Sequence, residues 1–99
     1  GKPARDEAEG TKLGLVVRPL TPEEKQGADT EGSVVVADVQ GSAERAGIQP
    51  GDIILAVNDQ AVKNVQDLRT AASHLRPGDA AALLVERGGT QIFVPVRAG

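Results

Sequence analysis

Turn signals divide this chain of 99 residues into short segments, and this division limits the folds that it can form. The clearest signals are Gln49-Pro50-Gly51-Asp52, Asn58-Asp59, Pro77-Gly78 and Arg87-Gly88-Gly89-Thr90. Gly, Pro, Asn and Asp favour turns because they supply a positive φ, a fixed φ or local side-chain hydrogen bonds. The length suits one domain, so we expect several short elements around a single core.

β-branched and other apolar runs between these turns predict strands. The runs lie at Leu13–Arg18, at Ser33–Val39 and within IILAVND, residues 53–59. Two further runs, joined by Arg87-Gly88-Gly89-Thr90, predict a hairpin over residues 81–96. A hairpin is antiparallel, so at least part of the sheet is expected to be antiparallel.

Two short helices are predicted between the first strands. Thr21 is placed to cap the first, with Glu24 as its capping-box partner and Gly27 ending it early. Ser42 is placed to cap the second, which Gly47 should end after little more than one turn.

A longer helix is predicted from Asn64, a capping residue, to the Pro77-Gly78 pair. Asp67 suits its first turn because a carboxylate there interacts favourably with the helix dipole. At helical spacing, one face collects the apolar residues Val65, Leu68, Ala72 and Leu75.

The order of these elements indicates the fold class. It reads strand, short helix, strand, short helix, strand, long helix, hairpin. Strands outnumber helices, so we expect an α+β, mainly β domain, with a small, strongly bent sheet of about five strands forming a partly open barrel or sandwich. Phe93 is the only aromatic residue, which leaves Val, Leu, Ile and Ala to build the core.

Two segments have little apolar patterning. Residues 1–11 are polar and charged, and we interpret them as a flexible linker or tail. Residues 21–32 hold four acidic residues and one lysine, a net charge of −3. A solvated surface excursion and an acidic patch facing a partner both remain open for this second segment.

Composition argues against several functions. A net charge of −3 disfavours nucleic acid as a main partner, and the apolar runs are too short for direct membrane insertion. With no cysteine and one histidine, we expect no metal and no cofactor. His74 falls near the end of the long helix, where the dipole explains it without catalysis. No serine occupies a nucleophile turn, so we expect this chain not to be an enzyme.

Gly14 interrupts the first apolar run, and two interpretations are open. It can be a bulge on a plain edge strand. Alternatively, Leu13-Gly14-Leu15 forms a tight loop that feeds an edge strand beside the long helix, where an extended peptide could add as a further strand. Converging amides in such a loop suit a terminal carboxylate. On the second interpretation, Gly14→Val should damage ligand binding more than folding.

The residues resemble the PDZ domain family. KLGL at residues 12–15 resembles its carboxylate-binding loop, and the block from Gly41 to Val62, GSAERAGIQPGDIILAVNDQAV, is its most specific match. Residues 64–79 resemble its groove helix, and the likeness covers residues 12–97. Leu15 stands where the family commonly has a bulky aromatic residue, which should alter the pocket.

The order of the strands resembles the circularly permuted PDZ domains of bacterial proteases. LGLVVRPLTPEE, residues 13–24, is especially similar to the second PDZ domain of HtrA/Deg-type periplasmic serine proteases. That resemblance implies a periplasmic location and a catalytic triad in a separate domain. Its implied partners are C-terminal or extended peptides of unfolded proteins and other subunits or domains of the parent protease.

The resemblance also implies the site residues. The loop that would hold the peptide carboxylate consists of Lys12, Leu13, Gly14 and Leu15. The groove would add Val16, Val17, Leu68, Ala72 and Leu75. Two alternatives remain: an assembly module with little peptide binding, and a PDZ domain of a membrane metalloprotease or secretion-system protein.

Overall fold

The computed structural model describes residues 13–28, 30 and 32–98. The predicted tail at residues 1–11 and the predicted site residue Lys12 lie outside this part of the chain. The elements are β1 (Leu15–Pro19), α2 (Pro22–Ala28), β2 (Val34–Val39), α3 (Gly41–Ala46), β3 (Ile53–Val57), β4 (Gln60–Ala61), α4 (Val65–Ser73), β5 (Ala80–Arg87) and β6 (Thr90–Arg97).

One antiparallel sheet organises the domain. Its strand order is β1-β2-β3-β5-β6, with β4 pairing to β3 outside this path. β1 and β6 stand at opposite ends of the order, so the sheet formed by the described residues is open. The mainly β, α+β class is confirmed. The five strands of this path match the number of about five that was expected, and the two-residue β4 is too short to show a pattern in the sequence.

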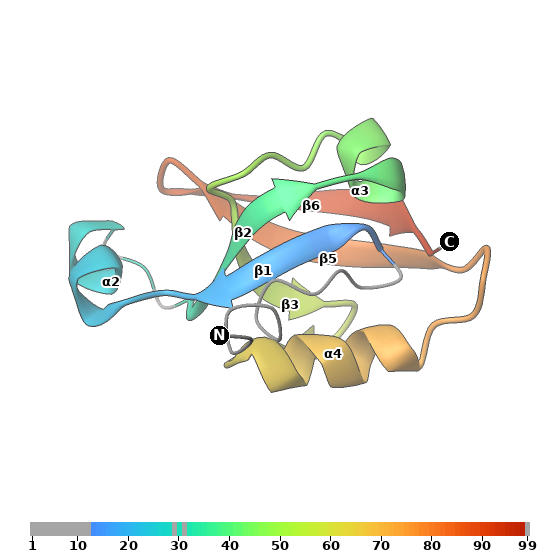
Figure 1. The fold of residues 1–99 in the computed structure, drawn as a ribbon, viewed down its shortest axis with the longest axis horizontal. Coiled ribbons are helices and arrows are strands. Elements are labelled where there is room, and N and C mark those ends of the chain that lie inside the picture. Colours follow the sequence, from blue (N-terminus) through green and yellow to red (C-terminus); the bar gives the residue numbers. More distant parts are fainter. Residues whose placement is uncertain (1–12, 29, 31, 99) are drawn as a thin grey trace, which may run out of the picture.

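The helices are distributed around the sheet (Figure 1). α4 packs against β1 and β3, and α3 packs against β6, while α2 stands beyond the end of β1. Among the described residues, no helix is long and apolar enough to cross a membrane.

Alternating side chains of the strands and one side of α4 form the core. β1 contributes Leu15 and Val17, β5 contributes Leu83 and Val85, and α4 contributes Leu68, all of them buried. The core is aliphatic, as the composition predicts. Phe93 lies outside it, with 68% of its surface exposed.

Three helix ends differ from prediction. α2 continues through Gly27 to Ala28, because a single glycine weakens a helix without necessarily ending it. Ser42 lies inside α3, and Gln40 is the N-cap, without a side-chain hydrogen bond. α4 ends at Ser73, before the Pro77-Gly78 pair.

The predicted capping residues otherwise act as expected. Gly47 ends α3 at φ +97, and the Asn64 side chain accepts a hydrogen bond of 2.7 Å from the Asp67 amide. At α2, the Glu24 amide donates to the Thr21 hydroxyl at 3.1 Å, and the Thr21 amide donates to the Glu24 carboxylate at 2.9 Å. This reciprocal pair is the capping box expected from the sequence.

Arg18 fastens α2 to the end of β1. Its guanidinium donates two hydrogen bonds of 2.8 Å to the Glu24 carboxylate. This pairing, with the Thr21 amide, lowers the Glu24 pKa from 4.5 to about 2. Because the pKa is lowered in the folded state, any stabilisation from this pair is present above pH 4.5 and is lost as the pH falls towards 2.

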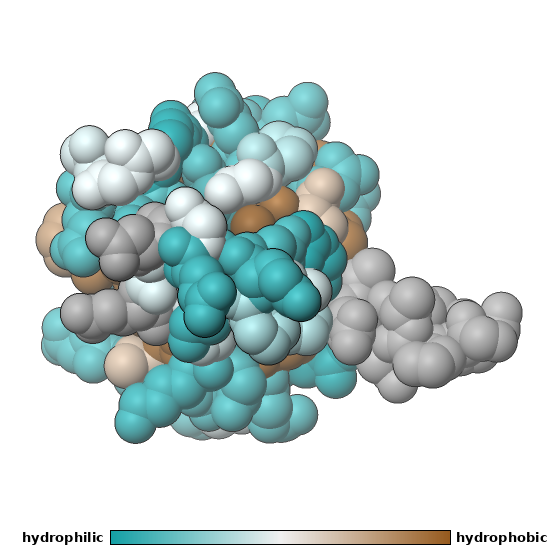
Figure 2. Space-filling view, turned by 90° about the vertical axis from the view of Figure 1, so that its left-hand side faces the viewer, coloured by the Kyte–Doolittle hydropathy of each residue, from teal (hydrophilic) through white to brown (hydrophobic). Residues whose placement is uncertain are grey.

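Polar groups dominate the surface around α2. Figure 2 shows this face mostly covered by hydrophilic side chains, with hydrophobic residues visible as separate patches. Within α2, Glu23 and Gln26 are exposed. This surface fits a solvated excursion, and it leaves the alternative of an acidic partner-facing patch untested.

Candidate functional site

The edge strand β1 and the helix α4 run alongside each other (Figure 1). Within the part of the chain that the structure describes, β1 pairs with β2 on one side, and its other side is the end of the strand order. The sequence predicted an edge strand with the long helix beside it, and the structure brings these two elements together.

The register shows which backbone groups of β1 face the open edge. The Gln40 amide donates to the Gly14 carbonyl at 2.9 Å, and the Leu20 amide donates to the Ser33 carbonyl at 2.8 Å. Paired residues in an antiparallel ladder alternate between bonded and non-bonded positions. Gly14 and Leu20 therefore face β2, as does every second residue between them. The N–H and C=O groups of Leu15 and Val17, at the alternate positions, point away from β2.

Pro19 supports this assignment. It occupies the same outward-facing register as Val17, where its missing N–H removes no hydrogen bond to β2. The edge of β1 therefore presents the N–H and C=O groups of two residues, Leu15 and Val17, on which another extended segment could pair.

Gly14 lies just before β1, with φ +85. Its carbonyl accepts the Gln40 amide, and a Cβ built on it would lie 2.0 Å from the Gln40 carbonyl oxygen. The irregularity in the β1–β2 register lies between Val16 and Val17. Gly14 is therefore a glycine of close backbone approach, and the bulge interpretation is wrong for this position.

Most side chains predicted to line the groove are buried. Leu13, Leu15, Val17, Leu68, Ala72 and Leu75 are each 7% exposed or less, and Val16 is half-buried. All but Ala72 and Val16 belong to the main core cluster. One helix face thus serves both the core and the predicted site, and the groups that these residues present at the edge are mainly backbone groups.

Two residues beside this site were not predicted. Gln40 fixes the glycine loop through its backbone, a contact that depends on the β1–β2 register and has no local signal. Arg69 of α4 is half-buried and, at helical spacing, lies on the same side as Val65 and Ala72. This helical spacing was the one sequence signal that could have placed Arg69 beside the predicted site.

An open β edge with a glycine loop at its start and a helix alongside defines a module that can receive an extended segment by strand addition. The PDZ domain family model matches residues 11–97. The chain belongs to the PDZ domain family, as the sequence resemblance indicated.

Curated relatives include a probable periplasmic serine endoprotease DegP-like from Hahella chejuensis. It is 37% identical over 86 residues, which cover 86% of this chain and 18% of that protein. The protein of the same name from Ectopseudomonas mendocina is 35% identical, over 89% of this chain and 19% of its own length. The chain therefore spans about a fifth of these relatives. Both names describe these relatives as periplasmic, the location that the resemblance implied.

Solved structures with the same fold include HtrA-type PDZ domains. The HtrA-type protease AlgW with decapeptide is 33% identical with a TM-score of 0.74, over 88% of this chain and 28% of that chain. The HtrA3 PDZ domain bound to the phage-derived ligand FGRWV is 26% identical with a TM-score of 0.73, over 87% and 82% of the two chains. The predicted likeness to HtrA-type PDZ domains is confirmed.

Proposed function

We propose that this chain is the peptide-binding PDZ module of an HtrA-type serine endoprotease. The observation that carries the proposal is the open edge of β1, with the Gly14 loop at its start and α4 beside it. The similar structures of AlgW and HtrA3 contain peptide ligands, which supports the same use here. The relatives favour this family over a membrane metalloprotease or a secretion-system protein.

In this proposal, the peptide binds as a strand antiparallel to β1. Its backbone pairs with the N–H and C=O groups of Leu15 and Val17, which face the open edge. Its terminal carboxylate accepts hydrogen bonds from amides of the loop at Leu13, Gly14 and Leu15, and Lys12 assists by its charge. Aliphatic side chains of β1 and α4 contact the last apolar side chain of the peptide.

Proteolysis belongs, in this proposal, to another part of the parent protein. The chain is a PDZ domain of about a fifth of the relatives' length, and we assign no catalytic residue to it. Its role is to capture substrate or to regulate the protease by holding extended apolar ends of unfolded proteins. Residues 1–11 would serve as the linker to a preceding domain.

A titration with matched peptides tests this function. We expect an apolar peptide with a free C-terminal carboxylate to bind with a Kd of about 1 μM or weaker, because the groove is short and its side chains are small. Amide chemical shifts of residues 13–17 should move on binding. The same peptide with a C-terminal amide is the control, and equal affinity for both peptides would refute the carboxylate loop.

A second candidate function is assembly with other subunits or domains of the parent protease. Phe93 favours it, because a large aromatic side chain that is 68% exposed costs less when a partner covers it. Phe93 is paired across the strands with half-buried Leu84, and exposed Pro95 follows two residues later on β6. Together they form an apolar surface away from β1.

Replacing Phe93 in the full-length parent separates the two candidates. If this surface mediates assembly, Phe93→Ser should shift the parent to smaller oligomers in light-scattering measurements. Peptide binding at β1 should remain unchanged. An oligomeric state identical to that of the wild type would count against assembly through Phe93.

A further inference from the structure

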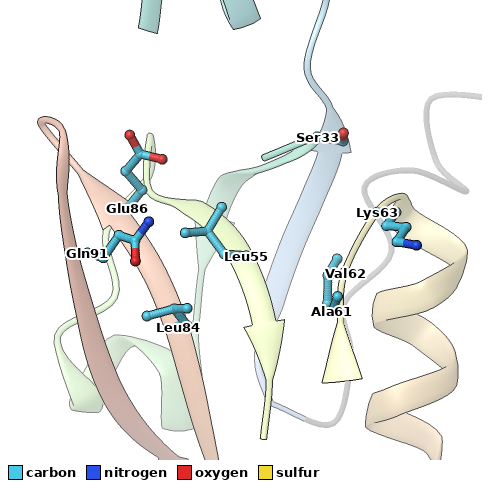
Figure 3. Close-up of a pocket in the computed structure, with 8 residues that line it drawn as sticks. All are labelled: Ser33, Leu55, Ala61, Val62, Lys63, Leu84, Glu86 and Gln91. Atoms are coloured by element: carbon cyan, nitrogen blue, oxygen red, sulfur yellow. The ribbon is translucent and has the colours of Figure 1, made fainter. Parts of the chain in front are cut away.

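A cleft of about 430 Å³ lies on the sheet away from the candidate peptide site (Figure 3). β3 and β5 provide its floor, and the segment that follows β4 forms its far side. None of the eight predicted site residues that the structure describes lines it. The peptide-binding function of β1 therefore leaves this cleft without a role.

The floor of the cleft is apolar. Leu55 and Leu84 lie along it and are half-buried, and the buried Val62 borders it opposite. Leu55 has no paired residue in the β3–β5 register, which skips from Ile54 to Ala56. Such a floor suits a short aliphatic chain. The polar groups around the floor determine which functional group at the end of that chain can bind.

Glu86 places a carboxylate at one end of this floor. Its residue is only 9% exposed, and the Thr30 hydroxyl donates to one carboxylate oxygen at 2.5 Å. An ionised carboxylate can accept about four hydrogen bonds. Gln91 is paired with Glu86 across β5 and β6, and its side chain lies beside Glu86 in Figure 3.

We infer that this cleft binds an arginine side chain of a protein partner. The three methylenes of arginine would lie on Leu55 and Leu84, and its guanidinium would reach the Glu86 carboxylate, with the Gln91 amide oxygen as a further acceptor. Guanidinium suits a sheltered carboxylate better than ammonium does, since it is more weakly hydrated and donates in a fork that matches two oxygens.

Among the described residues that line the cleft, Lys63 is the other charged one. It is exposed and stands on the far side from Glu86 in Figure 3. Its charge opposes a bound cation, although solvent weakens that repulsion. The cleft should therefore bind arginine more strongly when Lys63 is neutralised and more weakly when Glu86 is neutralised.

A titration of the domain with N-acetyl-arginine methylamide tests the inference by NMR. This probe has no carboxylate, so it lacks the group that the loop at Gly14 is proposed to bind. We expect saturable amide shifts at Leu55, Leu84 and Gln91, with a Kd of about 1 mM or weaker for a single side chain. Glu86→Gln should weaken binding about tenfold, the scale of one charge-assisted hydrogen bond. Its amide oxygen can still accept from Thr30.

Lys63→Ala provides a second variant at an exposed position and should tighten binding severalfold. Glu44→Gln, at an exposed position of α3, is the matched control and should leave the affinity unchanged. The citrulline analogue of the probe tests the need for a charge. Equal binding of citrulline, equal affinity of the Glu86→Gln domain, or shifts confined to residues 13–17 would each overturn the inference. Failure of peptide binding at β1 would not affect it.

Discussion

Asp52→Ala is expected to destabilise the domain by about 3 kcal/mol, because it removes a buried carboxylate that serves several donors. The Asp52 side chain is 3% exposed. It accepts hydrogen bonds from Arg87 Nε at 2.8 Å, from the second guanidinium nitrogen at 2.6 Å and from the Gln49 amide at 3.0 Å. The free energy of unfolding of a whole domain is typically roughly 5–15 kcal/mol, so this loss should be a large part of it.

Urea unfolding of Asp52→Ala and of the wild type measures this effect. Asp59→Ala is the matched control, since Asp59 is exposed in the turn after β3, and it should change the free energy of unfolding little. Arg87→Met should also destabilise, because it leaves the Asp52 carboxylate buried without its cation. Equal unfolding midpoints for Asp52→Ala and Asp59→Ala would show that the ion pair contributes nothing.

The structural importance of this pair had no signal in the sequence. Asp52 is part of a turn signal, Gln49-Pro50-Gly51-Asp52, and Arg87 begins the hairpin turn, 35 residues later. Each was correctly assigned to its turn, because turn chemistry is local. Their pairing follows from the register of β3 on β5, which brings the two turns together and which no local pattern specifies.

Elements with local causes were predicted well. The capping box of Thr21 and Glu24, the Asn64 cap and the hairpin joined by Gly88 and Gly89 depend on residues within a few positions of one another. The start of α3 was missed because a contact with a distant residue sets it, the hydrogen bond from the Gln40 amide to the Gly14 carbonyl. With Gln40 held there as the N-cap, α3 begins at Gly41, and its cap lies two residues before the predicted Ser42.

The sequence predicted which strand and helix form the candidate site, but it could not predict how far their side chains are buried. Side chains alternate along a strand, which puts Leu13, Leu15 and Val17 on one face, but alternation cannot decide whether that face looks into a pocket or into the core. In the structure these side chains are buried. The opposite case is Glu86. From the sequence, a glutamate in a hairpin strand is expected to be solvated, and only the structure shows the Thr30 hydroxyl and the cleft beside it.

The close approach of Gly14 to Gln40 changes what a substitution there will test. From the sequence, Gly14→Val was expected to damage binding more than folding. The structure makes folding itself the sensitive property, because a Cβ at Gly14 would stand 2.0 Å from the Gln40 carbonyl oxygen, at φ +85. A backbone atom in a paired ladder cannot move aside as the end of a flexible side chain can.

Gly14→Ala is therefore expected to lower the free energy of unfolding by about 2–4 kcal/mol, the sum of a disfavoured φ and an overpacked contact. Two other glycines separate these causes. Gly41 has φ +56, and a Cβ built on it would have nothing within 4 Å. Gly41→Ala should therefore lower the free energy of unfolding by about 1 kcal/mol, from the disfavoured φ alone. Gly27 lies in α2 with open space around it, so Gly27→Ala should raise the free energy of unfolding by about 0.5–1 kcal/mol. Urea unfolding of the three variants gives the order, and a Gly14→Ala domain as stable as Gly41→Ala would mean that the loop can move away from Gln40. That outcome would restore the variant as a direct test of carboxylate binding.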